Sequence, residues 1–260
     1  AVRPVVSLSP NWANILTGDW VTLTCDVGST AGTAPIYSWY KDNEMMNNNK
    51  QTNRQSLIIN NAKKTDSGTY QCQMDTSERS EPVSLSVTDG PLILQAPPYV
   101  YEGDSLTMRC YSESGGDTVF YKDNNTIKPM NGDFLHMNQV NVTVTGTYRC
   151  SKDKTYQTDD VFISVRELFS QPVIRVSTNP VTEGDTLSLT CDTQRGRYGE
   201  NTQLVFVFYK GRNEVQRNLS SEYRLPSVRV YDSGEYRCAA ATPDNTVFKW
   251  SSPINIQIPG

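Results

Sequence analysis

The stretch GDWVTLTC, residues 18–25, decides the fold, because the chain repeats it twice. GDSLTMRC occupies residues 103–110, and GDTLSLTC occupies residues 184–191. In the first copy Val21, Leu23 and Cys25 alternate with polar residues, and a period of two places them on one face of a β-strand. The other copies alternate in the same way. The sequence therefore predicts three copies of one strand-containing unit.

Two further phrases follow each copy of that stretch in the same order. One set is WYKDN (39–43), FYKDN (120–124) and FYKGR (208–212). The other set is DSGTYQC (66–72), VTGTYRC (144–150) and DSGEYRC (232–238). Because three phrases recur together, the repeat covers whole domains and not isolated strands.

The six cysteines stand at positions 25, 72, 110, 150, 191 and 238. Taken as consecutive pairs they are 47, 40 and 47 residues apart, which indicates a disulfide framework formed in an oxidising compartment. Zinc sites use closely spaced cysteines such as Cys-x-x-Cys, and the sequence has no such pair. Sequons at Asn124, Asn141 and Asn218 favour a glycosylated protein that is secreted or displayed on a cell surface.

Together these features predict an all-β chain of three tandem immunoglobulin-like sandwiches of the C2 or I type, each with one intradomain disulfide. In this fold an aromatic residue packs on the disulfide, and Trp39, Phe120 and Phe208 occupy that position. A tyrosine two residues before the second cysteine forms a corner bond, and we expect it at Tyr70, Tyr148 and Tyr236. The expected domains are residues 1–88, 89–168 and 169–260, joined by short linkers that contain proline.

The charge balance excludes several functions. The 260 residues carry 24 basic and 28 acidic side chains, and a net charge of −4 does not favour nucleic acid or an anionic membrane as partner. No apolar run approaches the roughly 20 residues that span a bilayer. The first residues, AVRPVVSLSP, do not have the pattern of a signal peptide. We expect a mature ectodomain without its signal and anchor, or a secreted protein.

Catalysis is not expected. His136 is the only histidine, and its place between Leu135 and Met137 predicts a solvated strand residue. Every cysteine has a structural role, and no serine has a recognisable catalytic partner. The chain is therefore predicted to be a binding protein, without catalytic residues, metal ligands or cofactor.

Sandwich proteins bind through loops and exposed sheet faces, and three loops of the second repeat are candidates. They are residues 111–118, residues 122–130 with Lys122 and Lys128, and residues 151–160 with Lys152, Lys154 and Tyr156. Tyrosine beside basic residues is common in interfaces. The alternative interpretation is an ordinary solvated loop in each case.

Trp20 alternates with Val21, so it should face outward, and we expect it to pack on a neighbouring strand of its own sheet. We expect Trp12 to cover the edge of the first core.

The chain resembles the Fc receptor and Fc-receptor-like family of leukocyte immunoglobulin receptors. VVSLSPNW (5–12) with GDWVTLTC resembles the start of their first domain, and PLILQAPPYVYEGDSLTMRC (91–110) the start of the second. Four later segments resemble the third domain of the high-affinity, IgG-binding members. They are RELFSQPVI (166–174), RNLSSEYR (217–224), DSGEYRCAAAT (232–242) and KWSSPINIQIP (249–259).

The resemblance implies that the chain binds an immunoglobulin Fc region through its second domain and the elbow with the first. In Fc-binding members two tryptophans clamp an Fc proline, and Pro91 and Glu113 stand at their positions here. A glycan on Asn124 would lie on a turn used in that mode. Lys152, Lys154 and Tyr156 fall where the family has a basic contact loop that contains tyrosine.

The leading hypothesis is therefore an immune-cell surface receptor ectodomain that binds immunoglobulin Fc, with a separate signalling subunit as a further possible partner. The membrane would be reached only through a segment absent from this chain. A second hypothesis is an Fc-receptor-like protein with a non-immunoglobulin cell-surface ligand, which the missing tryptophans favour. A third is a soluble decoy or inhibitor.

Overall fold

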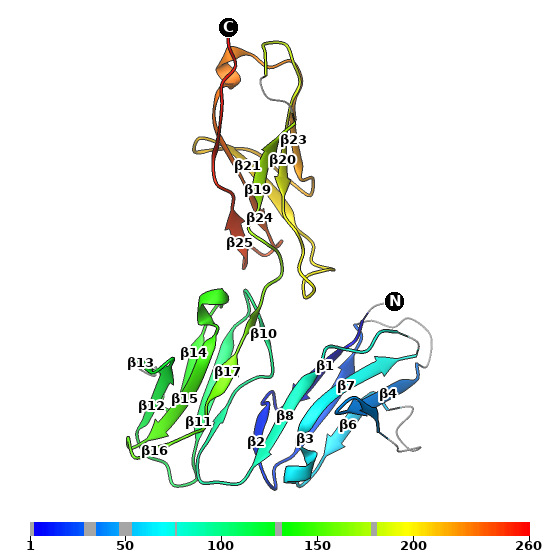
Figure 1. Cartoon of the computed structure of the whole chain (residues 1–260), viewed down its shortest axis with the longest axis vertical. Coiled ribbons are helices and arrows are strands. Elements are labelled where there is room, and N and C mark those ends of the chain that lie inside the picture. Colours follow the sequence, from blue (N-terminus) through cyan, green and yellow to red (C-terminus); the bar gives the residue numbers. More distant parts are fainter. Residues whose placement is uncertain (1–2, 29–34, 47–53, 76, 128–131, 178–180) are drawn as a thin grey trace. The chain divides into compact units, whose positions relative to one another are not determined.

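The computed structural model describes residues 3–28, 35–46, 54–75, 77–127, 132–177 and 181–260. In these residues the chain is all-β, and three immunoglobulin-like sandwiches follow one another, as predicted (Figure 1). The described helical segments are the single turns Lys64–Asp66 (η1), Val142–Val144 (η2) and Val230–Asp232 (η3). None of the described helices has the length and apolar character needed to cross a membrane.

The first sandwich contains a three-stranded and a five-stranded sheet. The smaller sheet is β1 (Val5–Ser9), β3 (Val21–Asp26) and β6 (Ser56–Ile59). The larger sheet, in spatial order, is β2 (Asn14–Leu16), β8 (Val83–Thr88), β7 (Gly68–Met74), β4 (Tyr37–Lys41) and β5 (Glu44–Met45). The stretch GDWVTLTC, residues 18–25, ends in β3, whose alternate residues Val21, Leu23 and Cys25 are buried.

The second sandwich repeats this plan. One sheet is β14 (Phe134–Met137), β11 (Leu106–Tyr111) and β9 (Ile93–Gln95). The other is β13 (Asn125–Ile127), β12 (Thr118–Lys122), β15 (Gly146–Lys152) and β16 (Tyr156–Gln157), with β17 (Val161–Ile163) also paired to β15. Two short strands, β10 (Val100–Tyr101) and β18 (Val165–Arg166), lie outside these sheets.

The third sandwich follows the same order. One sheet is β19 (Val173–Val176), β20 (Leu187–Asp192) and β23 (Glu222–Leu225). The other is β22 (Asn213–Asn218), β21 (Val205–Lys210), β24 (Gly234–Ala241) and β25 (Phe248–Trp250), with β26 (Ile254–Ile256) also paired to β24.

Each core is built around the predicted disulfide. The bonds join Cys25 to Cys72, Cys110 to Cys150 and Cys191 to Cys238. The predicted core aromatics Trp39, Phe120 and Phe208 are all buried. Trp12 packs against the first core as expected. Trp20 faces outward as expected, but 58% of it is exposed, so packing on a neighbouring strand covers less than half of it.

Two hydrogen bonds to the turn before the second cysteine recur in every sandwich; we call this turn the E–F corner. The predicted tyrosine corners are confirmed, with hydroxyls donated by Tyr70 to Asp66 O, by Tyr148 to Val144 O and by Tyr236 to Asp232 O. A lysine from the preceding phrase binds the carbonyl one residue earlier. These bonds are Lys41 to Thr65 O, Lys122 to Thr143 O and Lys210 to Tyr231 O.

The chain divides into two compact units. Unit 1 is Ala1–Val100, Ser105–Asn138 and Thr143–Ser164, and unit 2 is Tyr101–Asp104, Gln139–Val142 and Val165–Gly260. Within unit 1, Ala13 N donates to Ala96 O at 2.8 Å and the hydroxyl of Tyr99 donates to Val6 O at 3.1 Å. The ranges 1–88, 89–168 and 169–260 stay a prediction, since this division joins the first two sandwiches.

Candidate ligand-binding surface

The loop predicted at residues 151–160 is mostly a tight hairpin. β15 and β16 pair with Lys152 opposite Tyr156, and Asp153 and Lys154 both have left-handed φ angles, of 53° and 59°. Two successive left-handed residues give the turn that matches the twist of a hairpin. Lys154 is exposed at the turn, and 66% of Tyr156 is exposed beside it. The two side chains are therefore presented by ordered backbone.

A second loop supports this hairpin. Asp117 N donates to Asp153 Oδ1 at 2.8 Å, and Asp153 N donates to Asp117 O at 2.8 Å. Gly116, with φ 116°, allows the approach, because a Cβ there would lie 2.6 Å from Asp153 Oδ2. The structure thus brings the predicted loop 111–118 together with Lys154 and Tyr156.

Lys152 differs from the expectation of a surface contact. Its side chain is 4% exposed, and its ammonium donates to Thr118 Oγ1 at 2.6 Å and to the carboxylate of Asp133. The hydrogen bond from Lys152, reinforced by Thr118, lowers the pKa of Asp133 below its ordinary value. The ammonium is used inside the sandwich because Lys152 lies on the inward side of β15, above Cys150.

Lys122 is also engaged within its own sandwich, through the E–F corner bond to Thr143 O. The same bond in the other two sandwiches indicates a framework role for its ammonium. Lys128, the other lysine predicted in this region, lies outside the described residues.

Pro91 and Glu113, far apart in sequence, line one cleft of about 380 Å³ in unit 1. The cleft also has Thr17, Asp89 and Ser112 on its wall. Hydrogen bonds from Lys64 and then Thr17 lower the pKa of Asp89, so this carboxylate stays ionised. Glu113 is exposed. Pro91 and Glu113, which the family resemblance paired, thus line the same cleft, and the cleft wall carries carboxylate and hydroxyl groups.

All three sequon asparagines are exposed. Asn124 lies on the turn between β12 and β13, and its Oδ1 accepts a hydrogen bond from Arg149 Nη1 at 2.6 Å. Asn218 Oδ1 accepts from Ser220 N at 2.9 Å. Exposure is the requirement for a glycan, so all three sites are compatible with one.

The sequence patterns did not single out Arg109, a cationic residue of the second sandwich. Arg109 lies on β11 with its guanidinium carbon 4.3 Å from the ring centre of Tyr111 and 5.7 Å from that of Phe134. Its Nε is buried with no hydrogen-bond partner among the described residues. The alternation along the strand could have indicated it: Met108 and Cys110 point into the core, so Arg109 between them faces outward. His136 is exposed as predicted, and its ring nitrogens contact Thr107 and Asn138.

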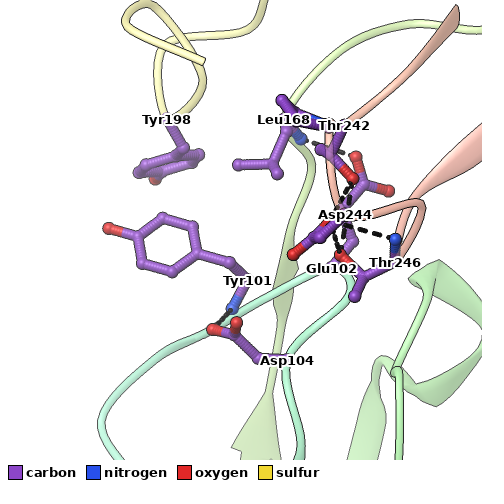
Figure 2. Close-up of a pocket in the computed structure, with 9 residues that line it drawn as sticks. Tyr101, Glu102, Asp104, Leu168, Tyr198, Thr242, Asp244 and Thr246 are labelled. Carbon is purple, nitrogen blue, oxygen red and sulfur yellow. Dashed lines mark hydrogen bonds between the residues drawn. The ribbon is translucent and has the colours of Figure 1, made fainter. Parts of the chain in front are cut away.

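Unit 2 has its own cavity, of about 550 Å³. Figure 2 shows the rings of Tyr101 and Tyr198 together on one side and Asp244 bonded to Thr242 and Thr246 on the other. These hydrogen bonds, the one from Thr242 first, lower the pKa of Asp244.

The most buried carboxylate among the residues that line this cavity is that of Glu102, which is 4% exposed. Its Oε1 accepts from Leu168 N at 2.7 Å and pairs with Lys249 at 3.0 Å. The polar groups on this wall therefore hold unit 2 together. The described residues contain no group of three metal-ligating side chains.

Comparison with known proteins identifies the chain. Immunoglobulin-domain family models match residues 3–75 and 171–258. Fc receptor-like protein 5 of Mus musculus is 32% identical over 99% of this chain and 45% of its own length. Fc receptor-like protein 4 of Homo sapiens is 30% identical over 99% of this chain and 51% of its own length. The chain belongs to the Fc receptor-like family.

This Fc receptor-like chain spans about half the length of those two relatives. Human Fc receptor-like A is 35% identical over 70% of the chain and 54% of its own length. The crystal structure of its second Ig-C2 domain is 35% identical, with a TM-score of 0.30, and covers 35% of this chain and 99% of that domain. As a member of this family the chain is an extracellular, immunoglobulin-domain part of an Fc receptor-like protein.

Proposed function

We propose that this Fc receptor-like chain binds an immunoglobulin Fc region through its second sandwich and the adjoining cleft, as part of a receptor on immune cells. The observation that carries the proposal is the presentation of Lys154 and Tyr156. Both are exposed on a hairpin that Asp117 and Asp153 hold against the neighbouring loop. A pre-organised tyrosine and a cation lose little entropy when a partner binds.

The cleft of Pro91 and Glu113 would form the second part of the surface. Its carboxylates and hydroxyls differ from the aromatic clamp that the family resemblance implies, so we expect a polar segment of the partner there. Glycans on Asn124, Asn141 and Asn218, and a separate signalling subunit, belong to the same proposal.

Binding of purified immunoglobulins tests this function. The glycosylated chain is immobilised, and each immunoglobulin class of the source species is passed over it. We expect at least one class to bind with a dissociation constant of roughly 10 µM or tighter. Lys154→Glu and Tyr156→Ala should each weaken that binding about tenfold. Lys63→Glu, a matched charge reversal in the first sandwich, should leave it unchanged.

The acidic cleft also favours a second candidate, a non-immunoglobulin cell-surface ligand with basic groups. If no immunoglobulin class binds, the Fc proposal is wrong. Binding to a ligand-bearing cell that Lys154→Glu abolishes would then support the second candidate. The third hypothesis, a soluble decoy, allows either ligand and differs in that the protein would not be anchored in a membrane.

A further inference from the structure

The outward face of the β21–β24–β25 sheet in the third sandwich is covered by its own aromatic layer. Tyr209 pairs with Arg237 across β21 and β24, and Ala239 pairs with Trp250 across β24 and β25. Ala239 and Val207 alternate with core residues and so point away from the core, yet both are fully buried. The larger side chains on this face therefore cover them, with the Trp250 ring tilted 54° to that of Tyr209 and 67° to that of Phe248.

Trp250 is the centre of the layer. Its ring centre lies 4.8 Å from that of Tyr209 and 5.1 Å from that of Phe248. The guanidinium carbon of Arg237 lies 4.1 Å from the Trp250 ring centre. Tryptophan, tyrosine and arginine are the residues most enriched in the energetic centres of protein interfaces. Here they are pre-organised, which reduces the entropy that binding would cost.

The second sandwich shows what this arginine does when it has an internal partner. Arg149 directly precedes Cys150, as Arg237 precedes Cys238, and it also lies over the strand tyrosine, 4.7 Å from the Tyr121 ring centre. Its Nη1 donates to Asn124 in the following turn. In the third sandwich that turn reads Gly211–Arg212 and offers no such acceptor.

Arg237 is consequently left without a hydrogen-bond or ion-pair partner within the described residues. Glu235 lies two residues earlier on the same outward face of β24 and is exposed. In the same described residues it too has no ion-pair partner. The face thus presents one cation and one anion side by side, next to an aromatic patch.

We propose that this face binds the same face of a second copy of the chain. A two-fold axis between the levels of Arg237 and Glu235 would place each arginine against the partner's glutamate, twice in one interface. Self-complementarity of this kind is the requirement for an isologous dimer. The aromatic layer would supply the apolar centre of the contact.

Sedimentation equilibrium of the whole 260-residue chain tests the proposal. We expect reversible dimers at roughly 0.1–1 mM, the range for a weak contact of this kind. Arg237→Glu and Glu235→Arg alone should each weaken dimerisation about tenfold, since each juxtaposes like charges. The double variant restores both opposite-charge pairs, so its dimer dissociation constant should lie within about threefold of that of the original chain. Trp250→Ala should abolish the dimer.

Arg212→Glu is the matched control, because it reverses an exposed charge on the adjacent turn outside the layer. A chain that stays monomeric at 1 mM would overturn the proposal, as would a double variant no better than the single ones. An equal effect of Arg212→Glu would also overturn it, by assigning the effect to net charge.

Discussion

Lys152 holds the carboxylate of Asp133 from inside the second sandwich, with 4% of the lysine side chain exposed against 46% of the aspartate's. The two residues belong to different sheets of the sandwich. Asp133 directly precedes β14 in one sheet, and Lys152 is the last residue of β15 in the other. The pair therefore links the two sheets near the candidate hairpin. Burying a cation in this way is tolerated only when it is paired and hydrogen-bonded.

Lys152→Met should destabilise the second sandwich by about 1–3 kcal/mol, because the methionine fills the space but removes the bonds to Asp133 and Thr118. Hydrogen exchange of peptides from residues 105–164 measures the loss locally. Lys154→Met, two residues away and exposed, should change stability by less than about 0.5 kcal/mol. Equal effects would contradict a structural role for Lys152.

Low pH should weaken the contact between Lys152 and Asp133. The pKa of Asp133 is lowered on folding, first by the hydrogen bond from Lys152. A group of this kind stabilises the fold above its unfolded pKa, about 3.9, and the contribution is lost as pH falls through the lower folded value. Asp133→Asn should therefore show a smaller drop in melting temperature between pH 7 and pH 3 than the unmodified chain. Parallel pH curves for the two proteins would rule this out.

Tyr148→Phe should remove the corner bond to Val144 O and cost about 1 kcal/mol at neutral pH. Burial, with the charge of Asp123 second, raises the pKa of Tyr148 to about 12. Stability from a raised pKa is complete below the unfolded value near 10 and is lost as pH rises toward 12. The variant should thus lose less stability than the original between pH 9 and pH 11, as measured by urea unfolding. An unchanged alkaline loss would mean that this tyrosine does not titrate with unfolding.

Gly116→Ala should disturb the junction of the two loops more than Gly115→Ala. Both glycines have positive φ angles, but only a Cβ at Gly116 would meet Asp153, at 2.6 Å. We expect the free energy of unfolding to fall by about 1–3 kcal/mol in Gly116→Ala and by about 1 kcal/mol in Gly115→Ala. Ligand binding should fall with Gly116→Ala alone if the hairpin needs this support. Loss of binding in both variants would point to the backbone of the loop as a whole.

The sequence was sufficient to predict the framework because its signals repeat. Alternation before Cys25, the three consecutive disulfides and the corner tyrosines are local patterns that occur three times. The exposure of Lys154 and Tyr156 was also predictable, since both follow the end of a strand phrase.

The burial of Lys152 could not be predicted in the same way. It depends on Asp133 and Thr118, which reach it only through the packing of two other strands. Lys122 is different, because its phrase recurs as WYK, FYK and FYK, and that recurrence was itself a sign of a framework role. The joint cleft of Pro91 and Glu113 depends on the segment between the first two sandwiches.

The E–F corner has a consequence for how such chains can diverge. Each lysine and each tyrosine of the corner binds a main-chain carbonyl, at Thr65 and Asp66 in the first sandwich and at Tyr231 and Asp232 in the third. A carbonyl is supplied by any residue, so the side chains of the turn are under no constraint from these bonds. One surface of every domain can therefore drift in sequence while the donors that fix its shape stay unchanged.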